Sequence, residues 1–286
     1  MDSVWMVYAR SMKTIFINAL NNITFPFLTT FHLSKKLYLC TKLIIMLSLF
    51  KSKPKLSELI PSGYVDIHSH VLPGIDDGAK TIEDSDFLIK EMKQLGFTKC
   101  ITTPHTMKNV WDNTPETIQN ALKKIESSLN LPVTLNVGSE YLLDETVVLK
   151  AKNKELLTIK DNFVLVELSY LNAPIQLYDY LFEIQLSGYH IILAHPERYR
   201  YFHPRKKEFD KLKSAGCLFQ LNLLATVGYY GKEIAKTANY LLQENYYDFA
   251  GSDIHHKNHI KAFQNKLVIN SSDLIQEVMN KNNFFI

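Results

Sequence analysis

Tyr64-Val-Asp66-Ile-His68-Ser-His70 is the stretch that decides the fold of this chain and the kind of site that it carries. Side chains alternate between the two faces of an extended strand, so Asp66, His68 and His70 are predicted to point the same way. Two imidazoles on one strand face can converge on a metal ion. Because solvent-facing histidines at a strand edge give the same letters, this stretch needs support from the rest of the chain.

Five further apolar runs end in residues that can bind a metal. They are Ile101-Thr-Thr-Pro-His105, Val137-Gly-Ser-Glu140, Leu165-Val-Glu167, Leu193-Ala-His195 and Phe249-Ala-Gly-Ser-Asp253-Ile-His255. Solvation alone is a poor explanation for so many coincidences. Glu140 and Glu167 end apolar strands, where an unpaired carboxylate would be costly, so a metal partner is favoured over a plain ion pair.

The apolar runs have the length of buried parallel strands, and helical patterns lie between them. The predicted strands are 64–70, 99–104, 133–139, 162–168, 190–194, 217–222 and 247–252. Thr81 and Thr114-Pro115 carry helix-start signals, and further helices are predicted over 175–186, 204–214, 232–244 and 271–280. This alternation predicts a parallel sheet with helices on its outside.

Nearly every predicted strand brings a polar residue to its C-terminal end. These residues are His70, His105, Glu140, Glu167, His195, Asn222 and Asp253. An open doubly wound sheet gathers its site at one switch point, whereas a closed barrel brings all strand ends to one mouth. The sequence therefore predicts an α/β fold with a distorted seven-stranded barrel and a metal site at the C-terminal ends of its strands.

The composition is that of a globular protein with a full core, and the charge is unevenly spread. Of the 286 residues, 46% are hydrophobic and 21% are charged. Residues 1–57 hold eight Lys or Arg against Asp2 alone, a charge of +7, so the remainder of a chain whose total is +3 carries −4. An acidic body without a basic stripe argues against nucleic acid as a partner.

The three cysteines, Cys40, Cys100 and Cys217, are far apart and form no Cys-x-x-Cys pair. This pattern suits a reducing compartment, so a cytoplasmic location is expected. In none of the three cases does an arginine stand six residues further on, so the chain lacks the Cys-x₅-Arg loop of thiol-type tyrosine phosphatases.

Residues 1–45 are predicted to be a non-native or disordered extension ahead of a natural start at Met46. Thr14 to Ser34 runs 21 residues without Lys, Arg, Asp or Glu, which is long enough for a membrane span. Its asparagines, proline and threonines suit hydrocarbon poorly, so no stable membrane insertion is expected, and a membrane-associated anchor is the alternative. Residues 46–63 are predicted to be a lead-in to one domain over 64–286.

Nine residues are candidate metal ligands, and all of them offer nitrogen or oxygen. They are His68, His70, Asp77, His105, Glu140, Glu167, His195, Asp253 and His255. Such donors suit Mn²⁺, Zn²⁺ or Fe²⁺, and nine are too many for one ion, so two or three ions are expected. The four carboxylates carry −4 and three divalent ions +6, leaving a centre of about +2 that would attract a phosphate dianion.

Two of these ligands have competing neighbours. Asp76 competes with Asp77, because Ile75-Asp-Asp-Gly78 also has the composition of a turn. His256 and His259 stand close to His255, and either of them can be a surface residue.

Arg198 is the candidate phosphate contact, since its planar fork matches two phosphate oxygens. The alternative is a loop salt bridge with Glu197 or another nearby acid. Asn222 is expected either to support the site or only to close a strand. Tyr229 and Tyr230 are expected to pack or to line the rim.

Seven ordered motifs between Tyr64 and the C-terminus carry a family resemblance. They are Asp66-Ile-His68-Ser-His70, Asp76-Asp77-Gly78, Thr103-Pro-His105, Gly138-Ser-Glu140, Val166-Glu167, Ala194-His195-Pro-Glu-Arg198-Tyr and Ser252-Asp253-Ile-His255. Together they resemble the polymerase-and-histidinol-phosphatase (PHP) superfamily. Within it, the chain is similar to the bacterial manganese-dependent protein-tyrosine phosphatases of capsular and exopolysaccharide gene clusters.

The resemblance implies a trinuclear metal centre in a distorted seven-stranded barrel, with Asp77 among the ligands and Arg198 on the phosphate. It implies that metal-activated hydroxide hydrolyses phosphotyrosine. The implied partner is the phosphotyrosine tail of a membrane tyrosine kinase that controls polysaccharide export. The chain departs from many relatives after the Asp-x-His motif, where it offers Lys257 and Lys261 in place of an arginine.

Two other functions fit the same ligands. A small-molecule phosphatase of the histidinol-phosphate type would use the same metal chemistry, with a lidded pocket in place of an open mouth. A catalytically silent metal-binding regulatory module would be expected to lack a ligand, and none is missing from the sequence. A nuclease is disfavoured because no basic track surrounds the motifs.

Overall fold

A computed structural model describes residues 52–286, so the predicted extension at residues 1–45 lies outside the described residues. In this range nine strands pair in parallel in two sheets. One sheet has the order β1 (Tyr64–Asp66), β2 (Phe97–Thr102) and β4 (Thr134–Val137). The other has the order β3 (His105–Thr106), β5 (Glu140–Leu142), β6 (Phe163–Glu167), β7 (His190–Ala194), β8 (Leu218–Asn222) and β9 (Phe249–Gly251). The predicted α/β fold with parallel strands is confirmed.

Two of the seven predicted strands are each followed directly by a second, short strand, and the chain changes sheet between the two. The run 99–104 ends as β2 before Thr103-Pro104, and β3 then pairs with β5 in the other sheet. Proline lacks the N–H that a sheet interior requires. The run 133–139 breaks at Gly138, where a Cβ would lie 2.5 Å from Cγ2 of Ile159, so only glycine allows this close approach.

The first predicted strand is shorter than expected. Strand β1 ends at Asp66, so His68 and His70 lie beyond it and their direction does not follow from strand alternation. Beyond β1 the chain continues alongside the segment that follows β9, because Ser69 forms an isolated parallel bridge with Ile254. This bridge brings the first and last ligand motifs together.

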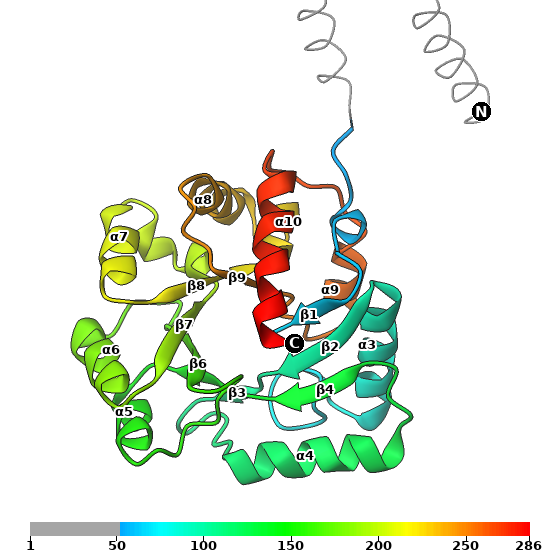
Figure 1. The fold of residues 1–286 in the computed structure, drawn as a ribbon, viewed down its shortest axis with the longest axis horizontal. Helices are drawn as coiled ribbons and strands as arrows, with labels where there is room; N and C mark the ends of the chain where they lie inside the picture. Colours follow the sequence, from blue (N-terminus) through cyan, green and yellow to red (C-terminus); the bar gives the residue numbers. More distant parts are fainter. Residues whose placement is uncertain (1–51) are drawn as a thin grey trace, which may run out of the picture. The chain divides into compact units, whose positions relative to one another are not determined.

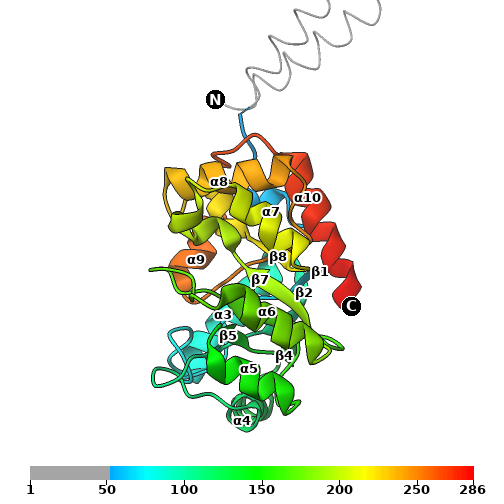
Figure 2. The same cartoon turned by 90° about the vertical axis from the view of Figure 1, so that its left-hand side faces the viewer.

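Helices connect the strands and cover the sheets on the outside. They are α3 (Ile82–Gln94), α4 (Pro115–Ser128), α5 (Glu145–Lys152), α6 (Leu177–Leu186), α7 (Lys207–Ser214), α8 (Lys232–Gln243), α9 (Lys257–Ala262) and α10 (Ser272–Lys281). Figure 1 shows α5, α6 and α7 outside β6, β7 and β8, and Figure 2 shows α6 beside β7 from another side. The predicted caps are confirmed: Thr81 and Thr114 accept backbone N–H bonds from Asp84 and Thr117.

Short 3₁₀ turns complete the described part of the chain. They are η1 (Leu56–Glu58), η2 (Pro196–Arg198), η3 (Arg200–Phe202), η4 (Leu223–Val227) and η5 (Asn282–Phe285). Turn η1 belongs to the packed body, because Leu56 is fully buried and its N–H donates to the carbonyl of Asn265. The predicted lead-in is thus packed from Lys53 onward, where the Lys53 ammonium donates to the carbonyl of Val268.

Turn η5 closes the N-terminal ends of the strands. Phe285 is fully buried, and its ring lies 4.8 Å from that of Phe249 at the start of β9. The Asn282 amide donates to the carbonyls of Val65 and Ala250 and accepts from the N–H of Ala250. We call Asn282 and Phe285 together the C-terminal plug.

Among residues 52–286, the structure contains no helix with the length and apolar character needed to cross a membrane.

Candidate metal centre

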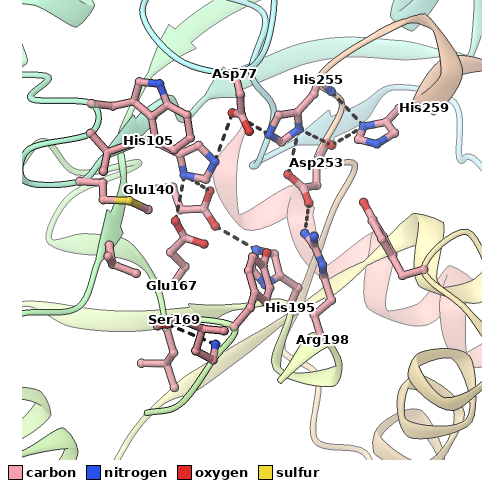
Figure 3. Close-up of a pocket in the computed structure, with 18 of the residues that line it drawn as sticks. Asp77, His105, Glu140, Glu167, Ser169, His195, Arg198, Asp253, His255 and His259 are labelled. Atoms are coloured by element: carbon pink, nitrogen blue, oxygen red, sulfur yellow. Dashed lines mark hydrogen bonds and ion pairs between the residues drawn. The ribbon is translucent and has the colours of Figure 1, made fainter. Parts of the chain in front are cut away.

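All nine predicted ligands lie at or beyond the C-terminal ends of β1, β2, β4, β6, β7 or β9, and we call them together the floor. Seven of them line one cavity, and the other two, His68 and His70, are fully buried beside these seven. His68 and His70 follow β1, Asp77 precedes α3, His105 opens β3, Glu140 opens β5, Glu167 closes β6, His195 follows β7, and Asp253 and His255 follow β9. Figure 3 shows carboxylates and imidazoles from these elements turned toward one another. The floor is therefore assembled from segments nearly 190 residues apart in sequence, between His68 and His255.

The donor atoms fall into four overlapping groups, each with its atoms within 4.8 Å of one another. The groups are His70, Asp77, His105 and His255; His68, His195 and Asp253; His68, His70 and Glu140; and His105, Glu140 and Glu167. Glu140, His68, His70 and His105 each belong to two groups, as expected of residues that lie between neighbouring ions.

Glu140 shows most directly that these atoms face a common space. Its Oε2 is fully buried and lies 3.1 Å from His105 Nδ1, 3.2 Å from His68 Nε2 and 3.4 Å from His70 Nε2. Despite these distances, Oε2 has no hydrogen-bond partner of acceptable geometry within the described chain. Nitrogens bound to one zinc-sized ion at about 2.0–2.1 Å stand roughly 3.3 Å apart, so this spacing fits ligands of a shared cation.

Glu167 and His105 form a second pair of buried polar atoms that lie close together. Glu167 Oε1 lies 2.9 Å from His105 Nδ1, yet both atoms are buried without a hydrogen bond in the part of the chain that the structure describes. Buried polar groups are otherwise paired almost without exception, so each unpaired one needs an explanation. Several such atoms on one floor, all of them nitrogen or oxygen, fit a site for divalent cations.

The floor carries an excess of negative charge, which a bound cation would neutralise. Burial opposes protonation of His70, but the carboxylates of Asp76 and Glu140 raise the pKa of His70 to about 10. Burial likewise opposes charge on His68, and the Glu140 and Asp253 carboxylates raise its pKa well above the usual value. The excess negative charge thus holds protons on imidazoles, and a metal ion that bound there would displace them.

Neighbouring side chains orient the two histidines of the opening motif. Asp76 Oδ2 lies 2.7 Å from His70 Nδ1, and Gln220 Oε1 lies 2.9 Å from His68 Nδ1. Each contact turns the ring so that Nε2 faces the floor, which is the usual role of a second hydrogen bond on a ligand histidine. The competition between Asp76 and Asp77 is therefore resolved in space: Asp77 faces the floor and Asp76 supports it.

Two of the nine residues hold unusual backbone conformations. His195 and Asp253 have φ angles of 36° and 52°, in the left-handed region that costs most residues energy. Gly251 comes just before Asp253, and a Cβ there would lie 2.6 Å from the Cβ of His68. The strained backbone and the close approach thus occur where polar side chains face the floor.

Arg198 stands at the edge of the floor. Its Nη1 donates to Asp253 Oδ2 at 2.9 Å, and its guanidinium lies 4.6 Å from the ring centre of Tyr170 and 4.2 Å from that of Tyr230. Burial disfavours its charge, but Tyr170 and Asp253 raise the pKa of Arg198 further.

Of the acids expected as alternative partners of Arg198, Asp253 forms the ion pair, whereas Glu197 is engaged elsewhere. Glu197 accepts from the N–H of Asn222 and from the hydroxyl of Tyr247. Asn222 in turn donates from Nδ2 to Asp253 Oδ2 at 2.7 Å, so it supports the floor and does not merely close a strand.

The cavity above the floor holds about 540 Å³ and has one apolar wall. We call this wall, formed by Met107, Val110, Trp111, Leu142, Leu168 and Leu171, the apolar wall. Trp111 lies parallel to the His105 ring, with centres 4.9 Å apart and planes at 15°. Sequence reasoning missed Trp111 and Tyr170, because both stand in loops without periodicity.

Some of the tyrosines, histidines and lysines expected near the rim line the cavity, and others do not. Tyr230 lines the cavity, whereas Tyr229 is partly exposed and packs against His259. His256 and His259 line the cavity together with His255. Lys257 and Lys261, both within the described residues, do not line it, so neither is a cation of this cavity.

Comparisons with known proteins found one matching family and several similar proteins. The family described as "Capsular polysaccharide synthesis, CpsB/CapC" matches residues 64–268. The CapC protein of Staphylococcus aureus is 30% identical over 195 residues, 67% of this chain and 76% of the relative. Tyrosine-protein phosphatase YwqE of Bacillus subtilis is 28% identical over 195 residues, which cover 67% of this chain and 77% of the relative. A solved structure, from work on YwqE of Bacillus subtilis and CpsB of Streptococcus pneumoniae as metal-dependent tyrosine phosphatases, has a TM-score of 0.65 and 26% identity, covering 70% and 84% of the two chains.

Proposed function

Because this chain belongs to the CpsB/CapC family of capsular polysaccharide synthesis, we propose that it is a metal-dependent protein-tyrosine phosphatase. The relatives YwqE and CpsB are tyrosine-protein phosphatases, and the solved structure similar to this chain comes from work on metal-dependent members. The observation that carries the proposal is the floor itself, where Glu140 Oε2, Glu167 Oε1 and His105 Nδ1 are buried close together without a hydrogen bond to any described residue.

The nine floor residues would hold two or three divalent ions, with Mn²⁺ as the proposed metal and Zn²⁺ or Fe²⁺ as alternatives. The support is a donor set of nitrogen and oxygen without thiolate. When bound, such ions would acidify water and polarise a phosphoryl group. Asp76 and Gln220 keep the two histidines of the opening motif turned toward that centre.

Arg198 would hold the phosphoryl group at the edge of the floor. Asp253 takes one of the five N–H donors of the guanidinium, so others can meet phosphoryl oxygens. The rings of Tyr170 and Tyr230 restrain the side chain from both sides, which lowers the entropy lost on binding.

The apolar wall favours an aromatic substrate over histidinol phosphate. A phosphotyrosine ring would bury apolar surface against Trp111 and Leu142, whereas a charged imidazolyl amine would lose its water there. The exposed tips of the wall, Val110 and Leu171, leave room at the mouth for the rest of a peptide.

We also propose a setting for this activity. The partner would be the phosphotyrosine tail of a membrane tyrosine kinase that controls polysaccharide export, met in the cytoplasm. Both cysteines of the described part of the chain, Cys100 and Cys217, are free and buried, in keeping with a reducing compartment.

The proposed phosphatase domain spans residues 64–286 as one distorted seven-stranded barrel. In this description β2 with β3, and β4 with β5, each count as one broken strand. The bridge between Ser69 and Ile254 supports closure between the first and last strands. Residues 46–63 would be its lead-in, and residues 1–45 would be dispensable for it.

A substrate panel tests the proposed function. Manganese-loaded protein would be assayed on a phosphotyrosine peptide, the matching phosphoserine peptide and histidinol phosphate. We expect kcat/KM to favour the phosphotyrosine peptide by about 100-fold or more, because the apolar wall rewards the ring. Faster turnover of histidinol phosphate would replace the proposal with a small-molecule phosphatase, and metal binding without any turnover would favour the regulatory module.

A further inference from the structure

Helix α6 carries an apolar stripe on its outer face. Ile175, just before the helix, is 97% exposed, and Phe182 and Leu186 are 61% and 70% exposed. Tyr178, Phe182 and Leu186 follow the spacing i, i+4 and i+8, which places them on one side of α6, and Ile175 lies in the turn that leads into the helix. We call these four residues the α6 stripe.

The stripe is unusual among the neighbouring helices. The opposite face of α6 is also apolar, with Leu177, Leu181 and Ile184 buried against the sheet. By contrast, the next helix, α7, exposes Lys207, Asp210 and Lys211. Helix α6 thus has apolar side chains on its outer as well as its inner face, with Asp179 and Glu183 between them, and exposed apolar patches mark binding sites.

The stripe begins four residues after Leu171, which lines the cavity. Leu171 lines the cavity and is 87% exposed, so it belongs both to the apolar wall and to the surface that leads to the α6 stripe. Ser169 fixes this rim, because its Oγ accepts from the N–H of Leu171 and its carbonyl accepts from the Tyr201 hydroxyl. A chain that leaves the cavity on this side must therefore cross Leu171 before it reaches Ile175.

We propose that the α6 stripe is the docking surface for apolar side chains that flank phosphotyrosine in the substrate peptide. The inference rests on the proposed function and adds a sequence preference to it. Tyr178 and Leu186 are separated by roughly 12 Å along α6, which an extended peptide spans in about four residues.

Continuity with the cavity selects a peptide as the occupant. A second copy of the chain seated on the stripe would stand against Leu171 and narrow the mouth through which the substrate enters. A peptide held in the cavity reaches the stripe without any rearrangement. Its apolar side chains would remove Ile175 and Phe182 from water, the main source of affinity for such surfaces.

The test compares Phe182→Asp and Ile175→Asp with the control Val268→Asp, which alters a half-exposed apolar residue beside η4. Each manganese-loaded variant would be assayed on p-nitrophenyl phosphate, on a phosphotyrosine peptide with Leu and Phe flanks, and on the same peptide with Ser flanks. Both stripe variants should lower kcat/KM about tenfold on the apolar peptide alone. The control should change none of the three values, and peptides with the apolar residues on one side only should show which side docks.

Equal kcat/KM of the stripe variants and the wild type on the apolar peptide would overturn the inference while leaving the proposed function intact. A wild-type dimer that Phe182→Asp dissociates, with peptide hydrolysis unchanged, would assign the stripe to a second copy and also overturn it. Failure of the wild type on p-nitrophenyl phosphate and on both peptides would instead remove the proposed function on which the inference rests.

Discussion

The two ends of the strands bury polar groups in opposite ways. At the N-terminal ends, the Asn282 side chain is fully buried and both its amide nitrogen and its oxygen are hydrogen-bonded. At the C-terminal ends, Glu140 Oε2 and Glu167 Oε1 are also buried, but neither has a hydrogen bond within the described residues. The N-terminal ends hydrogen-bond their own polar groups, whereas the C-terminal ends leave buried polar atoms available to a ligand.

The difference separates stability from function within one fold. The C-terminal plug covers the sheets with Phe285 and gives Asn282 its bonds, so changes there should act on folding. The floor keeps carboxylates and imidazoles close together at a cost in repulsion and desolvation, so changes there should act on chemistry.

The largest effect should come from the floor. Glu167→Ala removes a buried ligand, so we expect kcat on a phosphotyrosine peptide to fall about a thousandfold or more, with folding retained. Burial and the charge of Glu140 raise the pKa of Glu167, so its loss should not lower the free energy of unfolding of metal-free protein. Steady-state kinetics and thermal melts measure both quantities. Glu155→Ala, at an exposed site, serves as the control, and equal losses in both variants would contradict the assignment.

Changes in the C-terminal plug should lower stability and leave activity intact. Phe285→Ala leaves a cavity beneath the strands, so the free energy of unfolding should fall by about 3–5 kcal/mol while activity per folded molecule persists. Phe284→Ala, at the half-exposed neighbouring ring, should cost only about 1 kcal/mol. Denaturant titration of both variants measures the difference. A large loss of kcat in folded Phe285→Ala would contradict the claim that the C-terminal plug serves stability and not chemistry.

Arg198 should have an intermediate effect on binding. Arg198→Ala should weaken the binding of inorganic phosphate, measured as a competitive inhibitor, by about 1.5–3 kcal/mol. Arg198→Lys keeps the charge but not the planar fork, so it should recover only part of this loss. Unchanged inhibition by phosphate in Arg198→Ala would show that the Arg198 side chain only pairs with Asp253 and does not bind phosphate.

Much of the floor could be predicted because its ligands, apart from Asp77, stand in or at the end of apolar runs. Sequence reasoning read His68 and His70 as one strand face, whereas the strand ends at Asp66 and loop contacts aim the rings. The partner of His68 is Gln220, more than 150 residues away in the chain, and no local pattern links the two. A polar residue inside the apolar strand β8 was nevertheless a visible signal that was not used.

The strand breaks and short helices were harder to predict. Pro104 and Gly138 mark the two breaks, but only the pairing of β3 with β5 shows that the chain changes sheet there. Helix α5 is short, and its start depends on Asp144, which accepts from the N–H groups of Thr146 and Val147. Tyr170 could not be predicted, because its role depends on Arg198 reaching it from another loop.

The smallest effect should come from Cys217, which belongs to neither end. Cys217→Ser should retain kcat within about twofold, because a buried free cysteine usually only packs. Burial raises the pKa of Cys217 to about 12, so the thiol stays protonated at neutral pH and iodoacetamide should inhibit little. Loss of turnover in folded, metal-loaded Cys217→Ser would favour a covalent thiolate route over the metal floor.

The central claim is that the floor acts through bound metal, and a titration of metal-free protein tests it most directly. Metal content by mass spectrometry would be followed together with phosphotyrosine-peptide hydrolysis as Mn²⁺ is added back. The account predicts no turnover without metal, and full activity once two to three ions are bound per chain, as nine clustered donors allow. Full turnover by protein shown to contain no metal would contradict it.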